Sequence, residues 1–272
     1  EPRFFEYRSH RIAWYGQGDG PILLLLHGWG SSAAAFDGLC AGLQDIRQCC
    51  RLDFPGFGRS EALKEPWGLD DYADLVMHWA DHVLSDRGKP ADPRPLPEVD
   101  LLVHSFGNRV LLRMLGRKRW DRPVGKVVVT GGAGLKPRRS LKIRAILLLG
   151  RVLKSPSSVL PGRLSDLYLA RLRGSGVWKK LGSADYSKLT GPMRDTFSRV
   201  VNDHLDGELD AAAREMLLLW GTHDTATPLW MGRMIEKRMP GSALIELDGA
   251  GHYAFLEQPG RFLAIVRSYL SS

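Results

Sequence analysis

Short apolar runs alternate with amphipathic segments along most of the chain, and this alternation limits the fold more than any other feature. The run "PILLLLHG" at residues 21–28 is almost wholly apolar, as expected of a strand that is buried on both faces of a parallel sheet. The segment that follows, residues 31–43, has the apolar spacing of a helix and begins with two serines that would cap it. The alternation predicts an α/β fold in which helices cover a mostly parallel central sheet.

The same rhythm continues on both sides of a long interruption. Strands are predicted in the segments 49–56, 99–105, 125–132, 216–221 and 243–251, and helices in the segments 68–84, 106–117, 230–239 and 259–270. The proline-rich segment 90–98 predicts an extended loop. Because the alternation stops after residue 134, we expect a core of residues 1–134 and 213–272, with a mainly helical cap inserted at residues 135–212.

The composition is that of a folded globular protein, with 44% hydrophobic and 25% charged residues. No apolar run approaches the roughly 20 residues that a membrane-spanning helix needs, and no export signal is visible, so we expect a soluble protein. Cys40, Cys49 and Cys50 fit neither a disulfide framework nor a zinc site. They indicate buried thiols in a reducing, cytoplasmic compartment.

The stretch "LLVHSFGNRV" at residues 101–110 places Ser105 where a predicted strand turns into a predicted helix. A serine on such a turn projects its hydroxyl above the edge of the sheet, and small residues two positions before and after it let the turn close. Gly107 is one of these small residues, but Val103 occupies the other position, where its branched side chain is expected to crowd the turn. Taken alone, the pattern fits a nucleophile and a structural serine equally well.

A serine hydroxyl needs a base to take its proton and an acid to orient that base. Among eight histidines, His252 is preferred because "GAGHYAFLEQP" places it in a glycine-rich loop between the last predicted strand and the last helix. The acid is expected in a loop after an earlier strand, which favours Asp224. The competing Asp248 lies only four residues before the histidine and would have to fold back. Asp224 could instead cap the following helix, although Thr227 suits that role better.

Acyl transfer also needs hydrogen-bond donors for the negatively charged oxygen that forms on the substrate. The turn "HGWGSS" at residues 27–32 offers the backbone N–H of Trp29. The N–H of Phe106 directly follows the candidate nucleophile and would be the second donor.

These features resemble the α/β-hydrolase superfamily in type, order and position. The matching motifs are "HG-x-G" for the oxyanion loop, "D-x-PG-x-G-x-S" (here "DFPGFGRS"), "HS-x-G" for the nucleophile elbow, "WG-x-x-D" for the acid and "GAGH" for the histidine. The resemblance covers nearly the whole chain outside the insertion, which lies where that family has its cap. It implies five site residues: Ser105 as nucleophile, His252 as base, Asp224 as orienting acid, and Trp29 with Phe106 as oxyanion donors.

The resemblance further implies a cofactor-independent serine hydrolase that cleaves a carboxylic ester through an acyl-enzyme. Thioesterases, lipases and carbon–carbon bond hydrolases of this fold use the same residues, and a ligand-binding relative without activity is the alternative from another class. Ser105 argues against the haloalkane dehalogenase branch, which has an aspartate at that position. Besides Val103, Asn108 departs from the family by replacing a common glycine, which should affect helix packing more than chemistry.

Other patterns carry less information. The segment 130–137, "TGGAGLKP", follows a strand but lacks the last glycine of a phosphate-binding loop. His78 and His82 are four residues apart on a predicted helix, a spacing that two metal ligands can have, yet no third ligand is evident, so no metal site is expected. By the resemblance, His27 and His104 beside the candidate site are assigned packing and loop support.

Charge is distributed unevenly along the chain. The whole chain has a net charge of +8, whereas residues 136–180 hold twelve Lys and Arg and one acid, a net charge of +11. Within this segment, residues 140–155 mix apolar and basic side chains. Three interpretations are open: a hydrophobic wall over Ser105, which is favoured, weak contact with an anionic membrane surface, or attraction of acidic substrates. A small acyl ester is the expected partner and nucleic acid is not; no particular oligomeric state is indicated.

Overall fold

The structure, a computed structural model, describes residues 1–86, 98–117, 120, 122–137, 164 and 189–272. Within them lies an eight-stranded sheet with the order β1-β2-β4-β3-β5-β6-β7-β8. The strands are β1 Arg3–Tyr7, β2 His10–Gln17, β3 Ile22–Leu26, β4 Gln48–Leu52, β5 Val99–His104, β6 Val124–Thr130, β7 Leu217–Gly221 and β8 Ala243–Leu247. The strands from β4 to β8 in this order pair in parallel, which confirms the predicted α/β fold.

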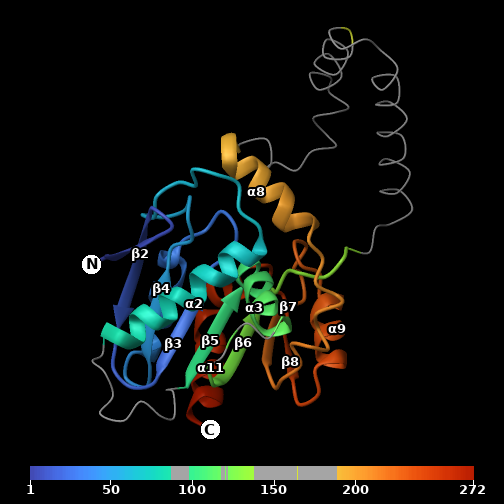
Figure 1. The fold of residues 1–272 in the computed structure, drawn as a ribbon. Coiled ribbons are helices and arrows are strands. Elements are labelled where there is room, and N and C mark those ends of the chain that lie inside the picture. Colours follow the sequence, from blue (N-terminus) through green and yellow to red (C-terminus); the bar gives the residue numbers. More distant parts are fainter. Residues whose placement is uncertain (87–97, 118–119, 121, 138–163, 165–188) are drawn as a thin grey trace.

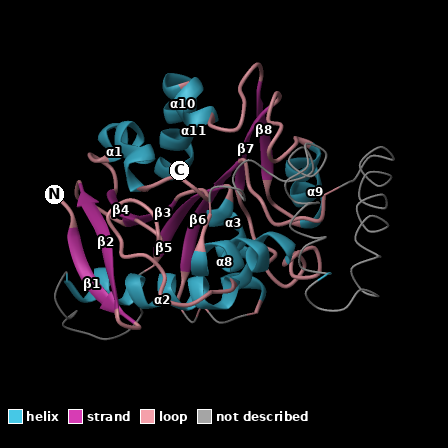
Figure 2. Ribbon diagram, turned by 90° about the horizontal axis from the view of Figure 1, so that it is seen from above, coloured by secondary structure: helices cyan, strands magenta, loops and turns pink. Residues whose placement is uncertain are grey.

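Helices cover both faces of this sheet. They are the 3-10 helix η1 Ala33–Phe36 and the α-helices α1 Asp37–Leu43, α2 Leu69–Asp86, α3 Phe106–Gly116, α8 Gly191–Asn202, α9 Trp230–Arg238, α10 Ala254–Glu257 and α11 Pro259–Ser271. Figure 2 shows α1, α10 and α11 on one side of the strands, with α2, α3 and α8 on the other. In Figure 1, α8 lies across the end of the sheet toward which β5 and β6 point.

The N-terminal hairpin of β1 and β2 is not predicted from the sequence. These two strands form the antiparallel edge of the sheet, where β2 pairs with β4. The turn between them consists of Arg8 and Ser9, which adopt φ of 46° and 59° without a glycine. The usual hairpin signal of Asn-Gly or Gly-Gly is therefore absent from the sequence.

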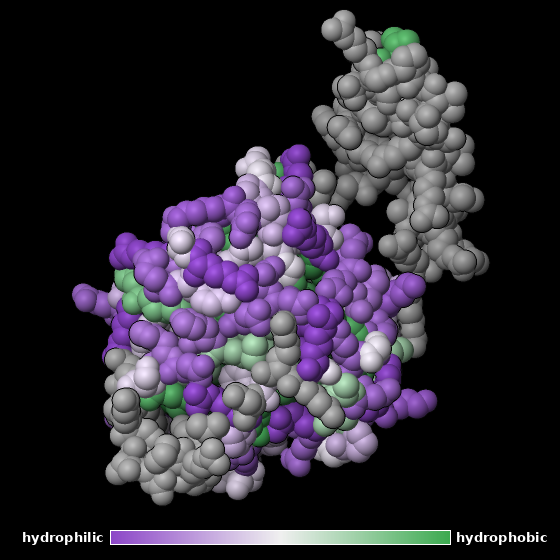
Figure 3. Space-filling view, viewed as in Figure 1, coloured by the Kyte–Doolittle hydropathy of each residue, from purple (hydrophilic) through white to green (hydrophobic). Residues whose placement is uncertain are grey.

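The central strands are apolar along their whole length because both of their faces are buried. Leu24 and Leu26 of β3 pack on the side of α2 and α3, whereas Leu23 and Leu25 pack on the side of α1 and α11. All four leucines are 0% exposed. Figure 3 shows that the described part of the visible surface is mainly hydrophilic, with apolar residues in small patches.

The first helix after β3 begins differently from the sequence prediction. Ser32 is the N-terminal cap residue of η1, but its side chain makes no capping hydrogen bond. The backbone N–H of Ala33 instead donates to Oδ1 of Asp53 at 2.7 Å. A carboxylate from the loop after β4 thus replaces the local serine cap, and rules that consider only neighbouring residues do not reveal such a partner.

Most of the predicted cap lies outside the described residues, and so do the basic segment 140–155 and nearly all of the proline-rich loop. The cap boundaries at residues 135 and 212 therefore stay predictions. Where the chain is described again, Leu205 and Leu209 are buried in the core beside α3. Within the described part of the chain, every helix is too short or too polar to cross a membrane.

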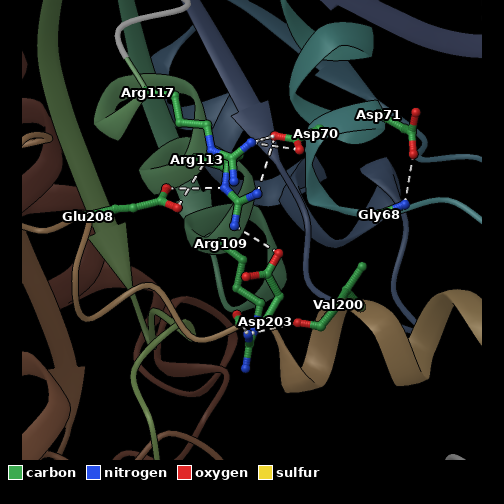
Figure 4. A network of polar contacts seen from close by, with 9 residues as sticks. All are labelled: Gly68, Asp70, Asp71, Arg109, Arg113, Arg117, Val200, Asp203 and Glu208. Atoms are coloured by element: carbon green, nitrogen blue, oxygen red, sulfur yellow. Dashed lines mark hydrogen bonds and ion pairs between the residues drawn. The ribbon is translucent and has the colours of Figure 1, made fainter.

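A buried arginine joins three separate segments on the α3 side of the sheet (Figure 4). Arg113 of α3 donates to Asp70 of α2 at 3.2 Å, to Asp203 at 2.8 Å and to Glu208 at 3.1 Å. Its side chain is 3% exposed, whereas Arg117, which binds the same Asp70 at 2.8 Å, is 47% exposed. Arg113 therefore holds α2, α3 and the segment after α8 together.

We expect Arg113→Leu to lower the free energy of unfolding by about 2 kcal/mol, as measured by urea denaturation. Removing one partner of a fully buried ion pair costs about 3–5 kcal/mol. The loss is smaller here because the three carboxylates are 42%, 37% and 21% exposed and regain water. The matched control Arg117→Leu removes an exposed pair and should cost less than about 1 kcal/mol. Equal losses in the two variants would contradict the special role of Arg113.

Candidate active site

Ser105 is the single residue between β5 and α3, and its backbone is strained. Its φ is 51° and its ψ is −108°, a conformation that costs a non-glycine residue on the order of 1–3 kcal/mol. Its N–H donates to the carbonyl of Thr130 at 3.2 Å, and its carbonyl accepts from the N–H groups of Asn108 at 3.0 Å and Ala133 at 3.1 Å. These bonds hold the sharp strand-to-helix turn that the sequence predicts.

The turn requires a residue without a side chain at position 107, which is Gly107, whereas Val103 does not disturb the turn. A Cβ atom on Gly107 would lie 2.4 Å from the carbonyl oxygen of Leu26, so only glycine lets α3 pack this closely on β3. The expected crowding by Val103 is wrong, because Val103 is buried within β5 and its side chain packs in the core. The side-chain amide of Asn108 donates to the carbonyl of Ala133 at 2.8 Å and joins α3 to the loop after β6.

The imidazole of His252 pairs with the carboxylate of Asp224. Nδ1 of His252 lies 2.8 Å from Oδ2 of Asp224, whose side chain is 0% exposed. Oδ1 of Asp224 accepts from the N–H groups of Ala226 at 2.9 Å and Thr227 at 2.8 Å. Burial alone would raise the pKa of Asp224, but the bonds from His252 and Thr227 outweigh it and hold this pKa below the usual value. The carboxylate is therefore ionised and orients the imidazole.

Asp248 does not act as the orienting acid, and Thr227 does not act as a helix cap. Asp248 is exposed, and its carboxylate accepts a hydrogen bond from the hydroxyl of Thr222 at 3.2 Å. Thr227 does not cap the following helix, since α9 begins only at Trp230. Its hydroxyl lies 2.8 Å from Oδ2 of Asp224 and 2.9 Å from the carbonyl of Gly131, and donates its single proton to one of them.

A cavity of about 500 Å³ brings the predicted site residues together: it is lined by Ser105 and His252 and also by Trp29 and Phe106. Phe106 is the first residue of α3, where backbone N–H groups lack partners within the helix. Neither its N–H nor that of Trp29 has a hydrogen-bond acceptor among the described residues. In the same part of the chain, no hydrogen bond joins the Ser105 hydroxyl to His252, although the two residues share the cavity.

Two buried histidines support the loops of the site. Nδ1 of His27 donates to the carbonyl of Gly28 at 2.8 Å, and its Nε2 accepts from the N–H of Phe54 at 2.9 Å. Nε2 of His104 donates to the carbonyl of His252 at 3.0 Å. Burial lowers the pKa of His27 to about 4 and, together with the nearby His252, that of His104 to about 3. Both rings are therefore neutral near pH 7, as these hydrogen bonds require.

The other histidine pair lies away from this cavity. The ring of His78 lies 5.2 Å from that of Tyr7, and the ring of His82 lies 5.2 Å from that of Phe5. These contacts pack α2 against β1. Among the residues that the structure describes, no three His, Cys, Asp or Glu side chains gather where they could hold a metal ion.

Comparison with known proteins identifies the family. A family model described as "Alpha/beta hydrolase family" matches residues 23–265, which is most of the chain. The chain belongs to the alpha/beta hydrolase family. This membership bears out the resemblance drawn from the sequence motifs and agrees with the observed fold.

Individual relatives of this hydrolase differ in the activity that their names state. Haloalkane dehalogenase 2 of Mycobacterium bovis is 25% identical over 287 residues, which cover 98% of this chain and 93% of that protein. The solved structure of an esterase from Exiguobacterium antarcticum has a TM-score of 0.70 at 18% identity and covers 99% of both chains. An enol-lactonase from Burkholderia xenovorans has the same TM-score and identity and covers 99% of this chain and 100% of that chain. The two structural similarities show the fold alone.

Three residues of the hydrolase site are not predicted from the sequence. Thr227 bonds to Asp224, as described above, and its place three residues after the acid was the available signal. Gly131 has a φ of 52°, and a Cβ there would lie 3.1 Å from Nδ1 of His252. Arg109 lines the cavity, and its position four residues after Ser105 places the two on one side of the helix.

We expect Gly107→Ala to lower the free energy of unfolding of the hydrolase by about 2 kcal/mol or more in urea denaturation. The added methyl group overlaps a backbone oxygen that cannot rotate away, and overpacking of this kind costs about 1–3 kcal/mol. The control Gly38→Ala lies in α1 with nothing within 4 Å of the new Cβ, so it should be neutral or stabilise by up to about 1 kcal/mol. A Gly107→Ala variant with the same free energy of unfolding as the wild type would show that α3 can move away from β3.

Proposed function

We propose that this protein is a carboxylesterase-like serine hydrolase that cleaves a carboxylic ester through an acyl-enzyme. The observation that carries the proposal is the pairing of buried Asp224 with His252, which lines the same cavity as Ser105 on its strained turn. A histidine held in one tautomer by a carboxylate, next to a serine on such a turn, is the arrangement that activates a hydroxyl for acyl transfer. Membership of the alpha/beta hydrolase family supports it further.

In the proposed mechanism, the Ser105 oxygen forms a bond to the carbonyl carbon of the ester while His252 takes the hydroxyl proton. The carbonyl electron pair moves onto the oxygen, which accepts hydrogen bonds from the N–H groups of Trp29 and Phe106. When the tetrahedral intermediate collapses, His252 gives its proton to the departing alcohol. Water then attacks the acyl-enzyme by the same steps, and the carboxylic acid leaves. Asp224 stabilises the protonated imidazole and remains ionised throughout.

Other activities of the fold stay as alternatives to this proposal. A thioesterase, a lipase or a carbon–carbon bond hydrolase would use the same nucleophile, and a panel of oxygen esters and thioesters of equal acyl length separates the first of these. Dehalogenation of the kind named for the Mycobacterium bovis relative is not favoured, because Ser105 stands at the nucleophile position. A ligand-binding protein without activity would bind these compounds but fail to react with a fluorophosphonate probe.

The remaining parts of the proposal concern partners and location. We propose a small acyl ester as the substrate, no bound cofactor, and a cytoplasmic location consistent with three buried, free cysteines. The basic segment 136–180, which could contact an anionic membrane surface, lies almost wholly outside the described residues and stays a prediction.

We expect Ser105→Ala to abolish ester hydrolysis and fluorophosphonate labelling. Removing the nucleophile of such a triad costs on the order of a millionfold in turnover. Hydrolysis of a short-chain chromogenic ester and labelling detected on a gel measure the two effects, and circular dichroism checks that the variant is folded. Substantial ester hydrolysis by a pure Ser105→Ala preparation would overturn the assignment.

We expect Asp224→Asn to reduce kcat about ten-thousandfold. The amide oxygen should stay on the N–H groups of Ala226 and Thr227, so that the amide NH2 faces His252, donates instead of accepting, and favours the wrong imidazole tautomer. Asp248→Asn is the matched control, since it makes the same change in an exposed carboxylate beside the same loop. Its kcat should stay within about threefold of the wild type, as expected for a surface position. A larger loss for Asp248→Asn than for Asp224→Asn would mean that the acid is misassigned.

A further inference from the structure

Arg109 is a cation built into the wall of the Ser105 cavity. It lies on α3, four residues after Ser105, and therefore about one helical turn behind it on the same side of the helix. Its residue exposure is 8%, yet it lines the cavity together with Ser105 and His252. A charged side chain that is so deeply buried and still borders a cavity is unusual and needs a compensating partner.

The guanidinium is held on one edge only. Nη1 donates to the carbonyl oxygens of Val200 and Asp203, each at 2.9 Å, at the end of α8. Figure 4 shows the side chain extending from α3 toward these two residues and away from the Arg113 cluster. Among the described residues, Nη1 is the one guanidinium nitrogen of Arg109 that donates a hydrogen bond. The fork of Nη2 and Nε is thus fixed in position with donors to spare.

The nearby acids are committed elsewhere. The carboxylate of Asp203 binds Arg113 at 2.8 Å, and Arg109 receives only the carbonyl of Asp203. The two buried arginines differ accordingly: the carboxylates around Arg113 outweigh its burial and raise its pKa, whereas burial lowers the pKa of Arg109 to about 10 despite the charges of Asp203 and Asp206. Among the described residues, the positive charge of Arg109 is therefore incompletely balanced.

The described lining of the cavity contains no carboxylate side chain, and Arg109 is its one permanent charge. Much of the remaining wall is aromatic or aliphatic. The ring of Trp29 lies 5.4 Å from that of Phe106 and 5.2 Å from that of Phe197. Among these described lining residues, an anionic group meets one buried cation, no like charge and an apolar surface for the rest of the molecule.

We propose that Arg109 binds a carboxylate of the substrate, so that the substrates of this site are esters that carry a carboxylate group in addition to the scissile ester. This inference rests on the proposed serine hydrolase function and names its substrate class. A guanidinium that is already anchored presents parallel N–H donors that match a carboxylate, and the apolar surroundings strengthen the pair. The part of the lining formed by Trp29, Phe106 and Phe197 receives the apolar part of the molecule.

The inference is tested with pairs of esters that differ only at one end. In one set, the monomethyl ester of glutaric acid is compared with the methyl ester of its isopropyl-terminated isostere. In the other set, the acetate ester of a hydroxy acid is compared with the acetate of the matching isopropyl-terminated alcohol. Within each pair, the ratio of kcat/KM for the carboxylated ester to that for the neutral ester is measured by acid release.

We expect the wild type to prefer the carboxylated ester in at least one set. Arg109→Met should lower that ratio about 10- to 100-fold, the effect of one charge-assisted hydrogen-bonded contact, and Arg109→Lys should recover part of it. The control Arg117→Met removes the arginine at the C-terminal cap of α3, which does not line the cavity, and its ratio should equal that of the wild type. If Arg109 only attaches α8 to α3, Arg109→Met will slow both esters of a pair equally, which would overturn the inference.

A binding measurement separates this inference from the proposed function. Calorimetry measures the binding of glutarate to Ser105→Ala and to the double variant Ser105→Ala with Arg109→Lys. This measurement depends neither on ester hydrolysis nor on the Arg109→Met variant. Glutarate binding that Arg109→Lys weakens, without hydrolysis of any ester by the wild type, would keep the carboxylate site and reject the ester proposal. Ester hydrolysis without a preference for the carboxylated member of either pair would keep the ester proposal and reject the carboxylate site.

Discussion

The backbone conformation of Ser105 is the constraint on which the rest of the site depends. A positive φ at a non-glycine residue persists only where its surroundings hold it, and here Thr130, Asn108 and Ala133 bind its two backbone groups. Two of these partners belong to β6 and the loop that follows it, not to the helix that Ser105 begins. The turn therefore requires β6 to pair in register with β5, and Gly107 must let α3 approach β3. Local strain is stored at the candidate nucleophile because the whole parallel sheet maintains it.

The loops at the carboxyl ends of the parallel strands are joined by neutral, buried histidines. His27 connects the loop after β3 to the loop after β4, and His104 at the end of β5 donates to the backbone of His252. His27 needs one protonated nitrogen that donates and one free nitrogen that accepts, whereas His104 donates from one protonated nitrogen. Burial disfavours the charged form of both rings. They fix the positions of the loops without adding charge to the site. Among the described residues, the charge near Ser105 is then set by the Asp224–His252 pair and by Arg109.

The sequence predicts the fold and the main site residues because both follow from chain order. In a parallel sheet, the carboxyl ends of the strands meet at one edge, so loops that follow different strands bring Ser105, Asp224 and His252 together. Partners that are distant in sequence leave no local pattern. Asp53 in place of the expected serine cap is one case, and the contact between Thr227 and Gly131, 96 residues apart, is another. The edge hairpin is missed because its turn lacks glycine and its strands are only partly buried.

Helix α3 links the chemistry of the site to the position of α8. Its first turn follows Ser105, its second turn provides Arg109, and its third provides Arg113, so one rigid element fixes three functions along its length. Arg113 is surrounded by carboxylates and only stabilises the fold, whereas Arg109 is bound by two carbonyls from the end of α8 and borders the cavity. An anion on Arg109 would bind the same guanidinium that attaches α8 and, as a charge-assisted partner, would help to fix its position. Under this proposal, substrate binding and the attachment of α8 would share a single side chain, which sequence periodicity alone would assign to the helix core.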